Sequence, residues 1–598
     1  MFNAPRPNLY PSNGLGSASF VDENPLSGST YGGVEDPWSS TPALPPPPPP
    51  LPSVFGNILV DATVPAVYQR AFELADPSGS GEVSVNILVR TLSTSGLSSS
   101  SIDRIINLVS SRPRVSKLEF YIALGLVALA QENKDIGIEQ LAAYAHNNTF
   151  PTPVLNLSSF VSASSTSHPA LSDIPPYSES ADPWIYGDPS LNGHPSTFPP
   201  PPRPNAPSSV TGALGFNWWK TQTNVEISTV PEKQGFILAR YTVYMVQTDR
   251  GASVARRYSE FAYLFDCLVR RYPFRLIPCL PPKRFGGDVN FLEQRRKGLL
   301  RFLRFVVNHP VIREDGLLAV FLTEPNLEAW RKHSSISLEE ESSSKRIDRV
   351  QEMGIPSDLE ERTAEVRRRI NPLIEQWTRL CIVAERILKR RESTASDISR
   401  LTTTMNALAE ENPESWRADG DEFYLGVRQG LLTTSRRFRL HADLLERRAR
   451  QTLVTSLEAL KAQRDLYIAT RDLFLRHDRL SGDEVEKLKK RVEMSSQKLE
   501  AIKNARKDGW AAEADKVLSS IELDQSAIAA ALARRVFIRH STWHELRVVL
   551  YNRENTLLSQ ALQGFAREER EFMESSLLGW AALTDELQSM PLEPVSHF

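Results

Sequence analysis

The pattern of apolar and polar positions predicts three very long helices in the C-terminal part of the chain. Apolar residues recur there every three or four positions, and the first run is Val366, Ile370, Ile374, Trp377, Cys381, Ala384 and Leu388. Helices are expected from about residue 363 to 411, from 416 to 504 and from 511 to 580. Pro372 indicates a kink or the true start of the first helix, and residues 481–483 indicate a kink in the second. At 1.5 Å per residue such helices span roughly 75–130 Å, and we expect an antiparallel coiled coil far longer than a compact bundle.

The segment from residue 217 to 332 has a different pattern, which predicts a mixed α and β domain. Alternating β-branched and aromatic residues predict strands at residues 224–228 and 240–246, and a third strand that ends near Phe261. A helix is expected from there to about Arg271, because apolar residues then recur at helical spacing.

A proline-rich stretch that cannot be helical separates this helix from a second one. Residues 277–283 contain three prolines, and residues 290 to about 308 then have helical periodicity. Asn290 is the expected N-cap of this second helix. Its buried stripe is expected to comprise Leu292, Leu299, Phe302, Leu303 and Val306.

Segments rich in proline and serine separate the folded parts of the chain. Residues 1–60 and 146–216 have the composition of disordered segments, and residues 45–50 and 199–202 are uninterrupted proline. The domains expected from these changes are a disordered arm at 1–60, a small helical domain at 61–145, a disordered linker at 146–216, a mixed α+β domain at 217–332, a linker at 333–356 and the helical tail at 357–590.

Composition excludes several classes of protein. The chain is 41% hydrophobic and 24% charged, which is typical of a folded, multidomain protein. Its longest apolar run, residues 122–130, is too short to span a membrane, and the first twenty residues do not resemble a signal peptide. Three cysteines predict neither a disulfide framework nor a metal cluster. No glycine-rich phosphate loop or histidine ligand spacing is present, so we expect no enzyme activity, cofactor or metal.

Charge is unevenly distributed. Residues 1–216 carry 9 basic and 17 acidic side chains, a net charge of −8, whereas residues 217–332 carry 19 and 11, a net charge of +8. The rest of the chain is nearly balanced, with 42 basic and 44 acidic residues. A basic block of this kind favours an anionic partner, and both nucleic acid and an anionic membrane surface qualify.

Three motifs in the basic block, in order along the chain, resemble the signature of the PX (phox-homology) domain. They are Arg-Arg-Tyr-Ser-Glu-Phe at 256–261, Pro-x-x-Pro-x-Lys at 278–283 and Glu-Gln-Arg-Arg-Lys-Gly-Leu at 293–299. PX domains typically bind phosphatidylinositol 3-phosphate, so the resemblance implies a phosphoinositide partner. Nucleic-acid binding is the weaker interpretation, because the aromatic residues of this block serve its core rather than a stacking stripe.

The resemblance assigns a role to each of four matched residues. Arg257 would grip the 3-phosphate, and Tyr258 would lie against the inositol ring. Lys283 would meet the 1-phosphate at the membrane surface, and Arg295 would hold the 4- and 5-hydroxyls. Phe285 is an insertion tip or, about equally well, a core residue.

A long antiparallel trio of helices directly after a PX domain resembles a BAR domain. This resemblance implies a homodimer or a higher oligomer that presses a basic concave face onto curved membrane. The candidate membrane contacts are Arg436, Arg437, Arg439, Arg447, Arg448 and Arg450, with Arg534 and Arg535 in second place. The alternative for each arginine is an ion pair or a solvated face.

The small helical domain resembles a degenerate EH domain, a paired EF-hand module. Residues 76–82 match the head of a calcium loop, but Ile87 stands where a bidentate glutamate should be. Residues 117–131 resemble the final EH helix, and residues 61–145 contain no tryptophan for a peptide pocket. We therefore favour a structural domain over a peptide-binding module or a calcium sensor.

The whole chain resembles the PX-BAR sorting nexins, in particular the fungal Mvp type of vacuolar protein sorting. The resemblance implies a cytoplasmic, peripheral endosomal protein that retrieves cargo and senses or makes curvature. Asp-Pro-Trp motifs at 36–38 and 182–184, with the proline-rich arm, are candidate ligands for adaptor proteins. The alternative is a phosphoinositide-targeted signalling scaffold that does not shape membranes.

Overall fold

The computed structural model describes residues 64–77, 79–146, 150–157, 215–230, 241–283, 289–410, 422–505, 510–590 and 592. All of them fall within residues 51–598, which contact one another as one unit. The predictions for Phe285, for the two Asp-Pro-Trp motifs and for the proline runs lie outside the described residues.

The N-terminal described region consists of two helix–strand–helix units. The short strands of the two units pair antiparallel, with Val83 opposite Val115. The elements are α1 (Ala66–Ala75), β1 (Glu82–Ser84), α2 (Val85–Ser93), α3 (Ser99–Val109), β2 (Arg114–Ser116), α4 (Lys117–Gln131) and α5 (Ile138–His146).

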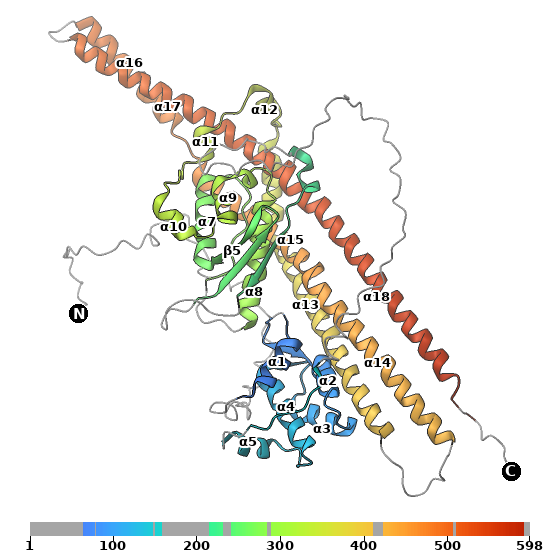
Figure 1. The fold of residues 1–598 in the computed structure, drawn as a ribbon. Coiled ribbons are helices and arrows are strands. Elements are labelled where there is room, and N and C mark those ends of the chain that lie inside the picture. The colour runs from blue at the N-terminus through green and yellow to red at the C-terminus, as the bar shows by residue number, and fades with distance from the viewer. Residues whose placement is uncertain are drawn as a thin grey trace, which may run out of the picture. The chain divides into compact units, whose positions relative to one another are not determined.

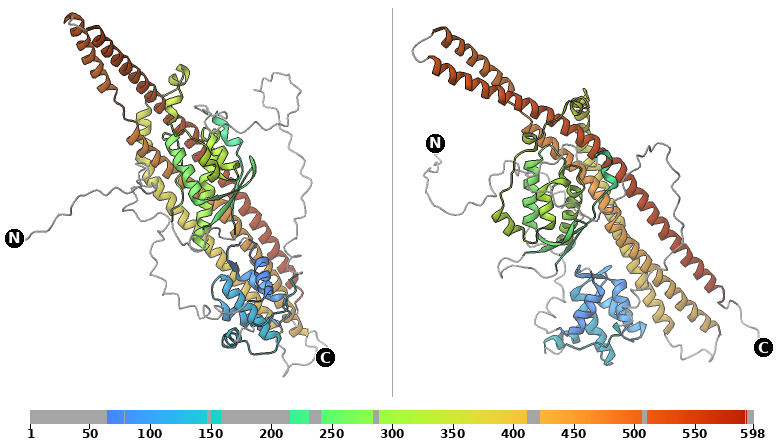
Figure 2. Two further views of the ribbon diagram at one scale, coloured as in Figure 1. Left: turned by 60° about the vertical axis from the view of Figure 1, so that its left-hand side comes forward. Right: turned by 45° about the horizontal axis from the view of Figure 1, so that its top comes forward.

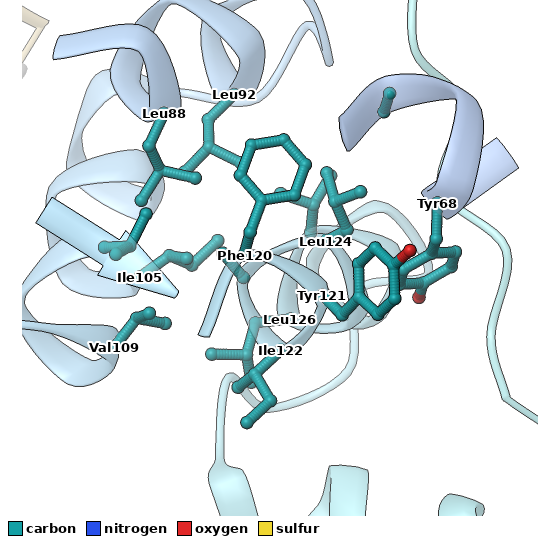
Figure 3. Packing of buried hydrophobic residues seen from close by; sticks show 14 of the residues in the cluster. Tyr68, Leu88, Leu92, Ile105, Val109, Phe120, Tyr121, Ile122, Leu124 and Leu126 are labelled. Atoms are coloured by element: carbon teal, nitrogen blue, oxygen red, sulfur yellow. The ribbon is translucent and has the colours of Figure 1, made fainter. Parts of the chain in front are cut away.

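One apolar core holds these two units together. α4 passes through its centre and buries residues on all sides, among them Phe120 and Leu124 (Figure 3). Tyr68 and Tyr121 meet edge to face with ring centroids 5.7 Å apart. A capping box at Ser116 fixes where α4 begins, as expected for a serine three residues before a glutamate.

The basic block forms a three-stranded antiparallel sheet followed by helices. The strands are β3 (Val225–Thr229), β4 (Val243–Thr248) and β5 (Gly251–Arg257), in the order β3-β4-β5. β5 ends at Arg257 rather than near Phe261, because the Glu260 carboxylate accepts the Arg257 backbone N–H (2.7 Å) and caps α7 (Tyr258–Arg271).

α8 (Val289–Val307) begins one residue before the predicted N-cap. Asn290 therefore lies in the first turn of the helix, and its assignment as the N-cap was wrong. The predicted stripe is buried except for Leu292, which is only partly covered. The shorter helices that follow are η2 (Ile312–Glu314), α9 (Gly316–Thr323), α10 (Leu327–His333), α11 (Glu341–Ser344) and α12 (Arg349–Met353).

The helical tail contains the three long segments that the periodicity predicts, with more interruptions than expected. The first segment is α13 (Leu359–Glu410), and Pro372 lies inside it, so this proline is not its start. The second is α14 (Glu422–Val454), α15 (Ser456–Leu480) and α16 (Val485–Ala505). The third is α17 (Trp510–His544), two π-helical stretches (Glu545–Leu550 and Asn552–Leu557) and α18 (Leu558–Leu587).

Antiparallel pairing organises these segments. α13 and α14 run side by side, and α16 and α17 form a second hairpin (Figures 1 and 2). The break between α15 and α16 falls at residues 481–484, where the sequence predicts a kink. A further break at Thr455 separates α14 from α15. The sequence around it contains no glycine or proline, so this break was not predicted.

A buried polar network joins the sheet domain to the long helices. Glu545, at the first π-helical stretch, is fully buried and accepts hydrogen bonds from Arg275 (3.2 Å), the Leu276 backbone N–H (3.0 Å) and His309 (3.0 Å). Arg275 also pairs with Glu341 at 2.8 Å. Burial alone would raise the pKa of the Glu545 carboxyl, but His309 and Arg275 hold that pKa well below its usual value.

A second anchor lies beside this network. The Trp218 indole N–H, on η1 (Gly215–Lys220), donates to the Val548 carbonyl at 3.1 Å. The Arg553 guanidinium lies 4.8 Å from the Trp218 ring centroid and 3.7 Å from that of Phe305. π-Helical turns release carbonyls from their usual helical bonds, and here one of them is satisfied by the indole.

Acid should weaken this junction. Burial, and after it the positive charge of Arg275, lowers the pKa of His540 to about 4. The unfolded chain then binds protons more readily than the folded one, so stability present above about pH 6.5 is lost as the pH falls towards 4. We expect the thermal midpoint to fall over this window, and to fall less in His540→Gln. His333→Gln, at an exposed position, is the control, and an unchanged slope in His540→Gln would contradict this account.

Candidate functional site

Three of the four predicted headgroup residues come together at the proline-rich loop. The Tyr258 hydroxyl, at the start of α7, donates to the Pro281 carbonyl at 2.6 Å. The Arg295 guanidinium, on α8, lies 5.0 Å from the Tyr258 ring centroid, and its Nη2 is 3.5 Å from the Pro282 carbonyl. Helix α7, the loop and α8 therefore converge on one place, and Lys283 is exposed at the end of the described loop.

Arg257 lies directly before Tyr258, at the end of β5. Its Nη2 is 2.8 Å from Glu328 on α10, and the two side chains are 35% and 56% exposed. Its guanidinium carbon is 5.7 Å from the Tyr241 ring centroid. The Arg257 guanidinium, which is predicted to bind phosphate, thus lies at the surface and is paired with the Glu328 carboxylate.

The neighbouring Arg256 has a different function, because successive residues of a strand point to opposite faces. Its side chain is buried and donates to the backbone carbonyls of Phe321 (2.9 Å) and Glu324. Arg256 therefore holds α9 against the sheet, and only Arg257 of the pair is available to a ligand.

Burial keeps the Tyr258 phenol neutral. It raises the pKa of Tyr258 to about 12, although Arg295 opposes this shift. The hydroxyl therefore stays protonated at neutral pH and continues to donate to Pro281. This bond holds the proline-rich loop against α7.

The six candidate arginines of α14 divide between two faces of the helix. Arg437 pairs with Glu586 on α18, and the Arg448 side chain, 2% exposed, pairs with Glu568 and Glu569. These two arginines bind α14 to α18.

The other four arginines share the opposite face. At 100° per residue, Arg436, Arg439, Arg447 and Arg450 lie within about 40° of Asp443. We call this set the arginine stripe. Arg436 and Arg447 are exposed, Arg439 is partly buried, and Arg450 is exposed but pairs with Glu446 at 2.8 Å.

The two second-place candidates are engaged within the chain. Arg534 donates to the Glu340 carboxylate (3.0 Å) and to the Leu480 carbonyl (2.8 Å). Arg535 pairs with Asp483 at 2.8 Å. Both bonds cross to neighbouring segments, so these arginines hold the base of the α16–α17 hairpin.

Apolar side chains remain exposed along the long helices. On both α13 and α18 they follow one face of the helix, as their spacing at 100° per residue shows. The exposed residues are Leu380, Val383, Ile387, Leu401 and Leu408 on α13, and Leu562, Phe565, Met573, Leu577 and Trp580 on α18. Exposed apolar side chains that gather on one face of a long helix are typical of a protein–protein interface.

Sequence reasoning missed two residues that matter at these sites. Glu328 looks like any surface glutamate, and its partner Arg257 is 71 residues away. Glu545 follows a histidine in the sequence and is not distinguished by any motif, whereas its carboxylate is the centre of the interdomain network. No local pattern distinguishes either one from a solvated side chain.

Comparison with known proteins identifies the family. The family model described as the PX domain matches residues 244–325, and the one described as the sorting nexin 8/Mvp1 BAR domain matches residues 335–594. A sorting nexin MVP1 of Cryptococcus neoformans is 35% identical over 99% of this chain and 100% of that protein. The chain belongs to the Mvp1 family of sorting nexins.

Two further relatives have the same name. A sorting nexin mvp1 of Aspergillus fumigatus is 29% identical over 97% of this chain and 94% of its own length, and one of Kluyveromyces lactis is 28% identical over 62% and 74%. The solved structure of an SNX-BAR Mvp1 tetramer aligns at a TM-score of 0.49, with 26% identity over 60% of this chain and 99% of that one.

Membership of this family confirms the coarser predictions. A PX domain is followed by a helical BAR domain, and the protein is a non-enzymatic adaptor. Sorting nexins of the PX-BAR kind are peripheral membrane proteins of endosomal compartments that act in protein transport. Among the described helices, none has the length and apolar character that a membrane span requires.

Proposed function

We propose that the protein binds phosphatidylinositol 3-phosphate on the cytoplasmic face of endosomes and retrieves cargo in vacuolar protein sorting. The convergence of Tyr258, Arg295 and the proline-rich loop, with Arg257 immediately beside them, supports this proposal. These residues bring a guanidinium fork, an aromatic face and an exposed lysine to one surface, which is the chemistry that a phosphorylated inositol requires.

Each residue has a distinct part in this proposal. The Arg257 guanidinium exchanges the Glu328 carboxylate for the 3-phosphate, which offers more negative charge to the same planar donors. Arg295, held over the Tyr258 ring, donates to the ring hydroxyls. Lys283 meets the 1-phosphate as a mobile point charge. The hydrogen bond between Tyr258 and Pro281 fixes the loop in advance and lowers the entropy lost on binding.

We further propose that a second copy of the chain covers the exposed apolar face of α13 and α18. Dimerisation places two headgroup sites on one particle, and two weak lipid contacts then act together through effective concentration. Arg436 and Arg447 are exposed membrane contacts of the helical tail in this proposal, and the rod of helices senses or makes curvature. The proline-rich arm and the Asp-Pro-Trp motifs recruit adaptor proteins, as the sequence predicts.

The N-terminal domain fits a degenerate EH-like module in this proposal. The pairing of the short strands β1 and β2 between two helix–strand–helix units supports this part of the proposal. The Asp76 carboxylate accepts the Gly81 backbone N–H (2.6 Å) and the Ser80 hydroxyl (3.1 Å), so its oxygens close the loop themselves. These bonds support the structural role that we propose for this loop.

Flotation with liposomes tests the lipid assignment. The full chain should float with vesicles that contain phosphatidylinositol 3-phosphate, and Arg257→Ala should lose about tenfold or more in affinity, because a charged hydrogen bond contributes about 1.5–3 kcal/mol. Arg270→Ala, at an exposed position on α7, is the matched control and should bind as the wild type does. Equal flotation of all three forms on any anionic vesicle would contradict the proposal.

A further inference from the structure

The proline-rich loop of the headgroup site follows a stretch of chain that the helical tail holds by its backbone. Arg476, on α15, donates from Nε to the Pro273 carbonyl (3.0 Å) and from Nη2 to the Arg275 carbonyl (2.8 Å). The next residue, Leu276, donates its backbone N–H to the Glu545 carboxylate (3.0 Å). Side chains of the tail therefore fix the backbone directly before the loop.

This stretch is buried, so its backbone groups depend on these side chains rather than on water. Phe274 and Leu276 are fully buried, and the Phe274 ring centroid lies 6.1 Å from that of His477 on α15. Burial lowers the pKa of Arg476 to about 10, so its guanidinium stays charged at neutral pH and keeps both donors. Hydrogen bonds from a charged group are stronger than those between neutral groups.

The loop and the helix that carries Arg295 share a support on α15. Burial, and after it the nearby Asp472 of α15, raises the pKa of the Cys279 thiol, inside the loop, to about 12. Arg301, on α8 six residues after Arg295, pairs with Asp465 of α15 at 2.7 Å. Both elements that present headgroup chemistry therefore contact the same helix of the tail.

The far end of the loop is held by the PX domain itself. The Tyr258 hydroxyl donates to the Pro281 carbonyl at 2.6 Å. Gly298, on α8, approaches Pro281 so closely that a Cβ there would lie 3.1 Å from two of the proline ring carbons. Lys283 then follows at an exposed position. The two ends of the loop thus have different supports, the tail at the base and the PX helices near the tip.

We infer that Arg476 is a positioning residue of the phosphoinositide site, and that α15 sets how firmly the proline-rich loop presents Lys283 to the headgroup. The inference rests on the proposed headgroup site and goes beyond it, because it assigns part of the lipid affinity to a residue of the helical tail. With its base fixed, the loop loses little backbone freedom on binding. By linkage, a bound headgroup in turn strengthens the contact of the loop with α15.

Calorimetric titration of the full chain with soluble, short-chain phosphatidylinositol 3-phosphate measures this contribution. Arg476→Gln should bind about five- to thirtyfold more weakly than the wild type, which is the cost of fixing the backbone of roughly one residue anew. Arg479→Gln, at an exposed position on the same helix, is the matched control and should bind as the wild type does. Wild-type affinity in Arg476→Gln would overturn the inference.

A double-mutant cycle separates positioning from a general loosening of the fold. Because Arg476 acts through the loop, Lys283→Ala should cost less affinity in the Arg476→Gln background than in the wild type. Arg257 lies on β5, outside the loop, so Arg257→Ala should cost the same in both backgrounds. If Lys283→Ala also cost the same in both, Arg476 would be a structural residue only, contrary to the inference.

Hydrogen exchange tests the base of the loop without a bound lipid. In the free protein, the amides of residues 274–280 should exchange faster in Arg476→Gln than in Arg479→Gln, by a factor similar to the loss of affinity. In the wild type, which needs no substitution, saturating soluble lipid should slow the exchange of the same amides. Unchanged exchange in either comparison would contradict the inference.

The outcomes separate the inference from the proposed function. Binding that depends on Arg257 but not on Arg476 would leave the proposed function standing and refute the inference. Faster exchange in free Arg476→Gln, with no binding of lipid by the wild type, would support Arg476 as the support of the loop and contradict the proposed function.

Discussion

Glu545→Ala should lower the free energy of unfolding of the PX-BAR unit by about 3–5 kcal/mol, the usual cost of breaking a buried ion pair from one side. The substitution leaves the fully buried Arg275 and His309 without the carboxylate that both contact, and it removes the acceptor of the Leu276 backbone N–H. Arg275 retains Glu341, which limits the loss. Urea unfolding, followed at the tryptophans, measures the effect.

The matched control is Glu571→Ala, because Glu571 is exposed on α18. This variant should unfold within about 0.5 kcal/mol of the wild type. The junction should also become more accessible to protease in Glu545→Ala, because the network contributes to holding the PX domain against α17 and the π-helical stretches. If Glu545→Ala were as stable and as resistant as the control, the network would not hold the two domains together.

Leu577→Asp should abolish self-association at concentrations where the wild type is dimeric. Leu577 is 69% exposed on the apolar face of α18, so the isolated chain tolerates a charge there. Burial of a leucine contributes about 1.5–3 kcal/mol, and a symmetric dimer buries the same residue twice. The dissociation constant should rise by about a hundredfold or more, because a carboxylate in an apolar interface adds its own desolvation cost.

Analytical ultracentrifugation measures this change. Leu592→Asp is the matched control, because Leu592 is 92% exposed and lies beyond the last helix. It should sediment as the wild type does. A dimer that survives Leu577→Asp would mean that the second copy binds elsewhere, and the exposed apolar face of α13 and α18 would then need another occupant.

Sequence alone predicts the helical tail and the order of the domains well. The apolar period of three to four continues for hundreds of residues, and tertiary context cannot easily override so long a pattern. The three PX motifs likewise identify Tyr258 and Arg295, which the fold brings together although 37 positions separate them. Only the resemblance links these positions, since periodicity contains no information about which loop meets which helix.

Whether an individual charged side chain is exposed or buried in an ion pair could not be predicted in the same way. Arg447 and Arg448 are neighbours in the sequence, yet one is exposed and the other is buried between two glutamates of α18. Successive residues of a helix point in directions 100° apart, and this difference places one arginine at the surface and the other against α18. A count of charges along the sequence contains no such information. Asn86 is similar, because its side chain forms hydrogen bonds with Ser399, Asp443 and Glu446, which lie more than 300 residues away in the chain.

The same limit explains the weakness of the motif-based reasoning at Glu545. Sequence inspection at this point finds only a glutamate next to a histidine on a helix, without the second histidine that a zinc-binding helix requires. Its real partners, Arg275 and His309, come from another domain. Long-range electrostatic pairs of this kind leave no periodic trace, so only the folded structure reveals them.

Titration with soluble, short-chain phosphatidylinositol 3-phosphate tests the central claim most directly, because a soluble headgroup isolates the Arg257 site from the basic helices. Calorimetry on the full chain should show binding that is at least tenfold weaker for the 4-phosphate isomer and for Arg257→Ala, since each removes the contact between Arg257 and the 3-phosphate. Arg270→Ala should bind as the wild type does. Equal affinity for the two isomers, or binding indifferent to Arg257, would contradict the account.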